Sequence, residues 1–333
     1  MKYLFFVFLS LLSCGRSTPS SKSKIIGGTS TVAPPYFVSL FLKGESTPFC
    51  GGALISPREV ITAAHCVSGL MSEIEVRFAV SDLEDLPNPH EVTAVVIHPR
   101  YHTKSIRFDI AWLSLRTQSH LAKPVKIETV HALQSELEVI GFGSTHAKVE
   151  SFPLKLQSAQ IDELAPYECR ALKGPFSTIE DNQICAGSLD GSQDSCFGDS
   201  GGPLVTSSRT LYGLVSWGVS CGEPGLPGVY TRVAAYGPWL SSPLNKDDLS
   251  EWVGAVFYFP LFYESRRFTA RYQLWGKATS SSPALKTWKR KVGDENITID
   301  LLEPSPGRYR LRLNRGDKVY ESATSFTELN RNT

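Results

Sequence analysis

Between residues 36 and 233 the chain is a succession of short strand-like runs separated by turns. The runs are rich in aromatic and β-branched residues, and residues 73–80 alternate between polar and apolar side chains, as a half-buried strand does. Helical periodicity is nearly absent except around residues 234–242. The pattern predicts an all-β domain with a short terminal helix, long enough for two barrels or a large sandwich.

Residues 246–333 form a second region of different composition. This region has no cysteine and many aromatic residues and arginines, and residues 308–313 alternate strictly before a turn-like sequence at 314–317. We predict a small C-terminal β-sandwich, of immunoglobulin-like type, as an accessory domain. The basic run at 286–291 is expected to protect an edge strand, and contact with anionic lipid or glycan is the alternative.

The N-terminus has the features of an export signal, which we assign to residues 1–15. Lys2 precedes an apolar run at residues 3–12 that is too short to cross a bilayer. Small residues permit ordinary cleavage at the end of the signal, whereas the leucines and serine before Cys14 resemble a bacterial lipoprotein box. We favour lipidation of Cys14 and keep ordinary cleavage as the alternative. The polar residues 16–24 then form a propeptide and tether.

Seven cysteines fit an exported protein. Six of them lie between residues 50 and 221, and the odd one is Cys14. In an oxidising compartment disulfides are the default. The net charge of +1 gives no sign of nucleic-acid binding. We therefore expect a secreted or exported chain, whose route to a membrane is a lipid anchor in the cell envelope.

The ten residues DSCFGDSGGP at 194–203 bring two acids and two hydroxyls together. If one of these serines is a nucleophile, it needs a base, and the base needs an orienting acid. Among the seven histidines, His65 lies in ITAAHC, directly before a cysteine that can hold it in place. The other six lie in polar or loop-like surroundings and are expected at the surface. Asp109 enters an otherwise apolar strand, so its carboxylate must be paired or hydrogen-bonded if it is buried.

Seven motifs follow one another in the order found in a well-known group of hydrolases. They are IIGG at 25–28, CGGALIS at 50–56, TAAHC at 62–66, DIA at 109–111, GDSGGP at 198–203, SWG at 216–218 and PGVYTRV at 227–233. The chain resembles a trypsin-like serine protease of the chymotrypsin family over about residues 25–242. The resemblance implies two six-stranded antiparallel β-barrels with a short C-terminal helix, in a protease domain at 25–245.

The resemblance also implies the catalytic residues. Ser200 is the nucleophile, His65 is the general base and then the general acid, and Asp109 orients the imidazole. The backbone N–H groups of Gly198 and Ser200 form the oxyanion hole. No metal or other cofactor is implied, and the acidic loop at 81–91 is expected to be solvated rather than to bind calcium.

A pocket for lysine or arginine is a further implication of the resemblance. Asp194 forms its floor, and a buried carboxylate there selects a positively charged side chain before the scissile bond. The other substrate-binding positions are Ser195, Ser216, Trp217, Gly218 and Gly228. The expected partners are therefore protein or peptide substrates cleaved after lysine or arginine.

By the same resemblance the chain is expected to be made as a zymogen. Cleavage after Lys24 frees the ammonium group of Ile25, which pairs with the buried carboxylate of Asp199. Without this partner the carboxylate is costly to keep inside the protein, so the uncut form is poorly organised.

The disulfides implied by the resemblance are Cys50–Cys66, Cys169–Cys185 and Cys196–Cys221. Leu137 and Thr206 replace a further bridge of the digestive enzymes. Phe142 stands where a tryptophan is usual, and Phe197 replaces a common glutamine at the lip of the pocket. None of these departures removes a catalytic residue.

Two functions of different classes remain from the sequence. The first is a secreted, monomeric serine endopeptidase. The second is a catalytically inactive homologue that acts as a binding protein. An inactive homologue would normally have lost the histidine, aspartate or serine of the triad, and all three are present here.

Overall fold

The computed structural model describes residues 25–241, apart from gaps at 69–73, 99, 131, 147–150 and 173, together with six strands between residues 256 and 322. The predicted signal segment, with Cys14, and the propeptide, with Lys24, lie outside the described residues. Within the described part of the chain, no helix is long and apolar enough to cross a membrane.

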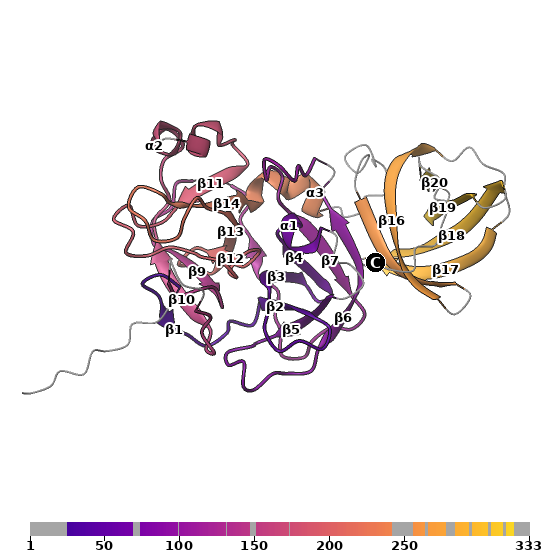
Figure 1. Cartoon of the computed structure of the whole chain (residues 1–333), viewed down its shortest axis with the longest axis horizontal. Coiled ribbons are helices and arrows are strands. Elements are labelled where there is room, and N and C mark those ends of the chain that lie inside the picture. Colours follow the sequence, from indigo (N-terminus) through magenta and orange to yellow (C-terminus); the bar gives the residue numbers. More distant parts are fainter. Residues whose placement is uncertain are drawn as a thin grey trace, which may run out of the picture.

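Six strands close into a first β-barrel (Figure 1). They are β2 (Phe37–Leu42), β3 (Cys50–Ser56), β4 (Glu59–Thr62), β5 (Ile74–Phe78), β6 (His90–Ile97) and β7 (Ala111–Leu115). Neighbours pair antiparallel in the order β5-β2-β3-β4-β7-β6. Strand β6 returns to β5 through Glu75↔Glu91 and Val76↔His90, which closes the barrel. One of the two predicted barrels is thereby confirmed.

A second antiparallel sheet contains the remaining strands of residues 25–241, which we call the protease-like region. They are β1 (Thr29–Ser30), β9 (Leu137–Gly141), β10 (Gln157–Ile161), β11 (Gln183–Ala186), β12 (Pro203–Val205), β13 (Thr210–Trp217) and β14 (Gly228–Arg232), with β8 (Lys126–Ile127) parallel to β13. The order is β1-β10-β9-β12-β13-β14-β11, and a single bridge joins Glu163, just after β10, to Ala186 of β11. A fully closed second barrel stays a prediction.

Strand β2 is apolar along most of its length because both of its faces are covered. Val38 and Leu40 belong to a buried cluster made only of residues from the first-barrel part of the chain. Phe37 belongs to another buried cluster, which also contains Ile140 and Leu214 of the second sheet. Since both faces are buried, the strand is a continuous apolar run rather than an alternating one.

Helices are few and short. They are α1 (Ala64–Val67), α2 (Pro166–Ala171), the 3-10 turns η1 (Gly174–Thr178) and η2 (Val233–Tyr236), and α3 (Gly237–Ser241). The last two confirm the short helical segment predicted near residue 240. Trp239 of α3 is buried in the cluster that joins the two halves of the protease-like region.

The C-terminal region consists of six antiparallel strands that continue the first sheet. They are β15 (Val256–Tyr263), β16 (Arg266–Lys277), β17 (Ala284–Val292), β18 (Glu295–Ser305), β19 (Arg308–Arg315) and β20 (Lys318–Ser322). Their order is β17-β18-β19-β20-β16-β15, and β15 pairs with β6 of the barrel. Figure 1 shows these strands beyond β6, on the side away from β9 and β12. An all-β region is confirmed here, whereas two packed layers stay a prediction.

Replacing Phe37 by alanine tests whether the cluster between the two sheets limits stability. Phe37 is 1% exposed and its ring lies 6.3 Å from that of Phe142. We expect Phe37→Ala to lower the free energy of unfolding by about 3–5 kcal/mol, through lost apolar burial and the cavity left behind. Urea denaturation of a Ser200→Ala background measures this loss.

The matched control for that experiment is Tyr167→Ala. Tyr167 is 73% exposed, so its removal is expected to change stability by less than about 0.5 kcal/mol. Equal effects of the two substitutions would contradict a core role for Phe37.

Candidate active site

Asp109 and His65 form a tight pair at the junction of the two halves of the protease-like region. Oδ2 of Asp109 lies 2.8 Å from Nδ1 of His65, and the backbone N–H of His65 donates to Oδ1 at 2.9 Å. The hydroxyl of Ser216, on β13, donates to Oδ2 at 2.6 Å. Asp109 is only 1% exposed, so these bonds replace the water that its carboxylate has lost. With Nδ1–H donating to the carboxylate, Nε2 of His65 is left as a base.

Ser200 lies in the loop before β12, and it lines a cavity of about 200 Å³. The backbone carbonyl of Ser200 accepts a hydrogen bond from the N–H of Gly51 at 2.8 Å, which fixes this loop against β3. Among the described residues, the acid to which the side chain of His65 hydrogen-bonds is Asp109. Within this described part of the chain, no hydrogen bond joins His65 to Ser200. Such a contact is often long in a free enzyme and tightens with substrate.

The backbone around Gly198 is arranged to present an N–H group. Gly198 has φ +97°, a conformation that other residues rarely adopt. The preceding carbonyl, that of Phe197, accepts a hydrogen bond from the N–H of Ser144 at 2.7 Å. In a trans peptide the C=O and the next N–H point in opposite directions. The N–H of Gly198 therefore points away from Ser144 and takes no part in that hydrogen bond.

The cavity beside Ser200 is lined by the sequence-predicted pocket residues. They include Ser195, Ser216, Trp217, Gly218 and Gly228. At its base, a Cβ atom added to Gly228 would lie 3.1 Å from Oδ1 of Asp194 and 3.0 Å from the hydroxyl of Ser195. Any side chain at 228 would thus stand between the cavity and Asp194.

Asp194 is a buried acid with an incomplete set of partners. It is 2% exposed, and its Oδ2 accepts a hydrogen bond from the N–H of Gly222 at 3.0 Å. Its Oδ1 is buried and makes no hydrogen bond of good geometry, although the N–H groups of Ser195 and Gly228 lie close enough to lower the pKa of the carboxyl. Burial raises the pKa of Asp194 to about 7, while backbone N–H groups, first that of Gly222, act in the opposite direction.

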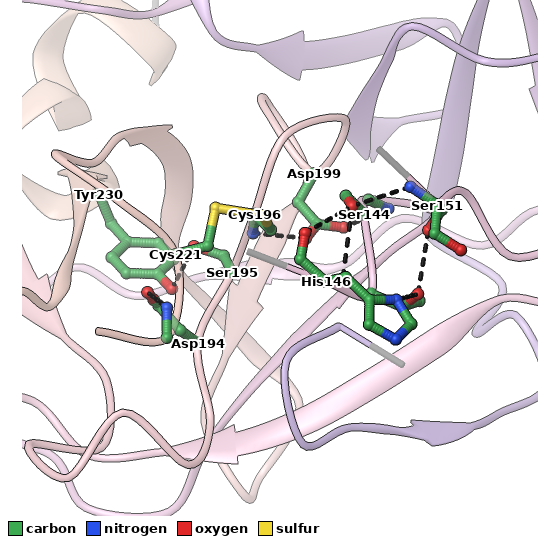
Figure 2. The surroundings of a disulfide bond; sticks show 12 residues. Ser144, His146, Ser151, Asp194, Ser195, Cys196, Asp199, Cys221 and Tyr230 are labelled. Carbon is green, nitrogen blue, oxygen red and sulfur yellow. Dashed lines mark hydrogen bonds between the residues drawn. A yellow bond between two sulfur atoms is a disulfide. The ribbon is translucent and has the colours of Figure 1, made fainter. Parts of the chain in front are cut away.

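A tyrosine hydroxyl orders the neighbouring serine. Tyr230 donates to Oγ of Ser195 at 2.9 Å, and Figure 2 shows both side chains grouped with Asp194 beside the Cys196–Cys221 disulfide. Tyr230 is completely buried, which raises its pKa well above the ordinary value, so it stays a neutral donor.

Asp199 is a second buried acid, on the other side of the same loop. It is fully buried, and its two oxygens accept hydrogen bonds from the N–H groups of Gly143 at 2.8 Å and Cys196 at 2.9 Å. Burial raises the pKa of Asp199 to about 7. Glycine is required at 143, because a Cβ atom there would lie 2.3 Å from the carboxylate. Ile25 is also fully buried, among second-sheet residues such as Leu137.

The three disulfides that the resemblance implies are all present: Cys50–Cys66, Cys169–Cys185 and Cys196–Cys221. The first ties α1, with His65, to β3. His65 also lies close to the sulfurs of Cys50 and Cys66, a grouping of the kind that can bind a metal. Both sulfurs are in the disulfide and so are not thiolates, which leaves His65 alone as a ligand.

His98, which was expected at the surface, is only half-buried, but its ring is held by aromatic side chains that the sequence did not indicate. The ring of His98 stacks on Phe108 at 5.4 Å and meets the edges or faces of Tyr236 at 5.1 Å and Trp239 at 5.2 Å. Desolvation, with a smaller effect of Arg100, lowers the pKa of His98 to about 4. A histidine in VVIHPR carries no local sign of these partners, since two of them lie more than a hundred residues away.

Two polar contacts of the site were also not predicted. Ser216 was expected only as a substrate-binding position, and its hydroxyl also donates to Asp109. Thr231 Oγ1 donates to the backbone carbonyl of Asp109 at 2.8 Å. The motifs SWG and PGVYTRV contain both residues, so the motifs marked the positions without revealing these bonds.

Comparisons with known proteins agree on one family. The family model described as Trypsin matches residues 25–240. Trypsin 5G1 of Aedes aegypti is 38% identical over 228 residues, which cover 66% of this chain and 85% of that protein. Trypsin of Sus scrofa is 33% identical over 230 residues, 66% of this chain and 96% of its own length.

A solved structure gives the same result for the fold. It is described as neuropsin, a serine protease expressed in the limbic system of mouse brain. The match has a TM-score of 0.59 and 30% identity, and it covers 66% of this chain and 99% of that one.

The raised pKa values of the buried acids predict how the stability of the uncut chain depends on pH. Between about pH 4, the pKa of a solvated aspartate, and about 7, the folded chain holds a proton on Asp194 that the unfolded chain has released. The free energy of unfolding therefore falls as pH rises through this window. The slope approaches 1.4 kcal/mol per pH unit, about one proton. Asp199, whose pKa is raised in the same way, lowers the free energy of unfolding further as pH rises through this window.

Urea unfolding of Ser200→Ala and of Ser200→Ala with Asp194→Asn, at pH steps across that window, measures the effect. We expect Asp194→Asn to make the free energy of unfolding less dependent on pH, by the slope that corresponds to about one proton. Parallel curves for the two proteins would contradict the burial of an uncompensated Asp194 carboxyl.

Proposed function

Because the chain belongs to the trypsin family of serine endopeptidases, we propose that it cleaves protein substrates after lysine or arginine. The observation that carries this specificity is the buried Oδ1 of Asp194, which makes no hydrogen bond of good geometry. A lysine ammonium or an arginine guanidinium would supply the missing donors and neutralise the acid. An apolar side chain in the same cavity would leave the buried carboxylate unpaired, which is costly.

Substrate lysine has a second acceptor available. The Ser195 hydroxyl lines the cavity and accepts a hydrogen bond from Tyr230, so its second lone pair remains available for an ammonium donor. Both lysine and arginine therefore fit the chemistry at the floor of the cavity.

We propose that Ser200 performs the chemistry with His65 and Asp109. The Ser200 Oγ attacks the scissile carbonyl carbon while its proton passes to Nε2 of His65. The C–N bond then breaks, and the same proton goes to the leaving amine. Water deacylates the enzyme by the reverse use of His65, and the Ser200 hydroxyl is restored.

The partners of Asp109 support its role in this sequence. Three hydrogen bonds hold its carboxylate beside Nδ1 of His65, where it would stabilise the imidazolium formed at each proton transfer. The N–H groups of Gly198 and Ser200 would hold the developing oxyanion, and one such donor is worth about 3–4 kcal/mol. The inactive homologue is not supported, since the triad side chains are present and two of them are already paired.

We propose that the enzyme is activated by cleavage after Lys24. In the uncut chain the Asp199 carboxyl has only backbone partners, and burial disfavours its charge. A new ammonium at the buried Ile25 would supply a counter-charge for it. Formation of the pair would then stabilise the loop that carries Gly198 and Ser200.

Disulfides agree with an oxidising compartment, and relatives of this family are typically secreted. We propose export by the signal at residues 1–15, with lipidation of Cys14 as a temporary attachment to the cell envelope. Cleavage after Lys24 would separate the protease from that anchor.

Specificity is tested with ester substrates of lysine, arginine and phenylalanine. We expect an initial burst of leaving group from the lysine and arginine esters with the activated chain and none with Ser200→Ala. Asp194→Asn is expected to lower kcat/KM for the two basic esters by about 10³-fold, the cost of losing one member of a buried ion pair. Its kcat/KM for the phenylalanine ester should change far less. A wild-type preference for the phenylalanine ester would contradict the proposal.

Activation is tested with Lys24→Gln against Lys22→Gln, a matched control two residues earlier. We expect the control to mature to a chain that begins at Ile25, and Lys24→Gln to stay uncut with under about 1% of the activity, since several kcal/mol of ion-pair energy are missing. Intact mass and ester hydrolysis give the two readouts. A fully active Lys24→Gln chain with an N-terminus elsewhere would contradict the proposed activation site.

A further inference from the structure

We propose that the C-terminal strands, residues 256–322, hold the loop that carries Asp109 in its working position. This proposal rests on the catalytic role proposed for Asp109. The segment responsible is the start of β15, which adds to β6 at the root of that loop.

Strand β6 leaves part of one edge uncovered within the barrel. Residues 95–97 pair on one side with β7, whereas β5 pairs with β6 only at residues 90 and 91. Strand β15 pairs along the remaining edge, with Val256 opposite Ile97 and Tyr258 opposite Val95. Unpaired edges expose backbone donors and acceptors, so β15 completes the barrel where the barrel's own strands separate.

The covered edge lies at the root of the Asp109 loop. Ile97 pairs with Ala111 of β7, and the N–H of His98 donates to the carbonyl of Ile110 at 3.1 Å. The chain leaves β6 after Ile97 and returns to β7 just after Asp109. Val256 thus pairs with the last β6 residue before the loop.

The loop has a strained shape that its surroundings must maintain. Ile106 and Phe108 have φ values of +47° and +52°, in the left-handed region that such residues rarely adopt. Phe108, directly before Asp109, stacks on the ring of His98 at 5.4 Å and also contacts the guanidinium of Arg100 at 3.9 Å. Both partners of Phe108 belong to the segment that follows β6. A displaced β6 end would move them, and strained residues persist only while their surroundings are fixed.

A second contact supports the same attachment. Ile299 of β18 is completely buried, and it belongs to the apolar cluster that contains Val96 of β6, Trp112 of β7 and Trp239 of α3. The C-terminal strands therefore meet β6 by backbone pairing and by apolar packing. The cavity lined by Ser200 and Gly228 lies in the second half of the protease-like region, so substrate binding does not depend directly on this contact.

The test uses proline substitutions in the full chain. In an antiparallel ladder, successive residues of a strand direct their N–H groups to opposite neighbours. Either Phe257 or Tyr258 therefore donates to β6 and the other to β16, so Phe257→Pro and Tyr258→Pro are both made. The matched control is Phe262→Pro, since residue 262 pairs with β16 alone.

Hydrogen exchange in a Ser200→Ala background reads the attachment without any activity. We expect amides of residues 97–111 to exchange at least about tenfold faster in one of the two β6-side variants, and unchanged in Phe262→Pro. Exchange in β18 and β19 reports whether the C-terminal strands remain folded. Equal exchange of residues 97–111 in all three variants and the parent would overturn the proposal, as would equal loosening by Phe262→Pro.

Steady-state kinetics of the activated chain tests the effect on Asp109. We expect the same sensitive variant to lose about tenfold or more in kcat on a lysine ester with KM nearly unchanged, because misplacing a catalytic group impairs chemistry rather than binding. Valine at the sensitive position, which keeps the backbone N–H, should restore kcat. A rise in KM alone would overturn the proposal. Absence of lysine-ester cleavage by the wild type would instead refute the proposed function, and the exchange result would still stand.

Discussion

Asp109 is one residue at which polar bonds join the two halves of the protease-like region. It accepts hydrogen bonds from His65 of α1 and from Ser216 of β13, and its backbone carbonyl accepts one from Thr231 of β14. A buried acid must keep such partners, because it has no water to replace them. The two sheets can therefore shift relative to each other only at the cost of these bonds. The apolar cluster around Phe37 and Trp112 provides most of the buried contact between the two sheets. The hydrogen bonds of Asp109 fix their relative position.

The buried carboxylates of Asp109, Asp194 and Asp199 differ in how the protein compensates for their lost hydration. Asp109 has hydrogen bonds from the chain itself at all times. Asp194 and Asp199 have fewer, and burial raises the pKa of each to about 7. A buried carboxylate with too few hydrogen-bond donors is a candidate site for binding a cation. In the proposed function Asp194 binds the substrate's cation and Asp199 binds the new N-terminal ammonium. Recognition and activation therefore both depend on a buried carboxylate that lacks a counter-charge.

The sequence could predict what depends on local pattern. Runs such as FVSLFL identify strands, and the order of the motifs leads to a trypsin-like domain, which the comparisons bear out. It could not predict the bond between Ser216 and Asp109, which joins residues 107 positions apart, or the stack of His98 on Phe108 beside Tyr236. These contacts follow from how sheets pack, and periodicity within one strand contains no information about the partner across the interface. The pairing of β15 with β6 was missed for the same reason, since any strand with a free edge can accept another.

Backbone pairing also explains why such an attachment places few demands on the residues of the candidate site. Adding a strand to an edge requires N–H and C=O groups in register and few particular side chains. The pocket residues lie on strands and loops of the second sheet, whereas the attachment is on β6 of the first barrel. Under the proposed function, a change in the C-terminal strands would therefore reach the chemistry through the position of Asp109 and leave the proposed recognition of lysine or arginine by Asp194 intact. Because the proposed triad is divided between the two halves, the half that carries His65 and Asp109 is the one through which we propose that the C-terminal strands act on turnover.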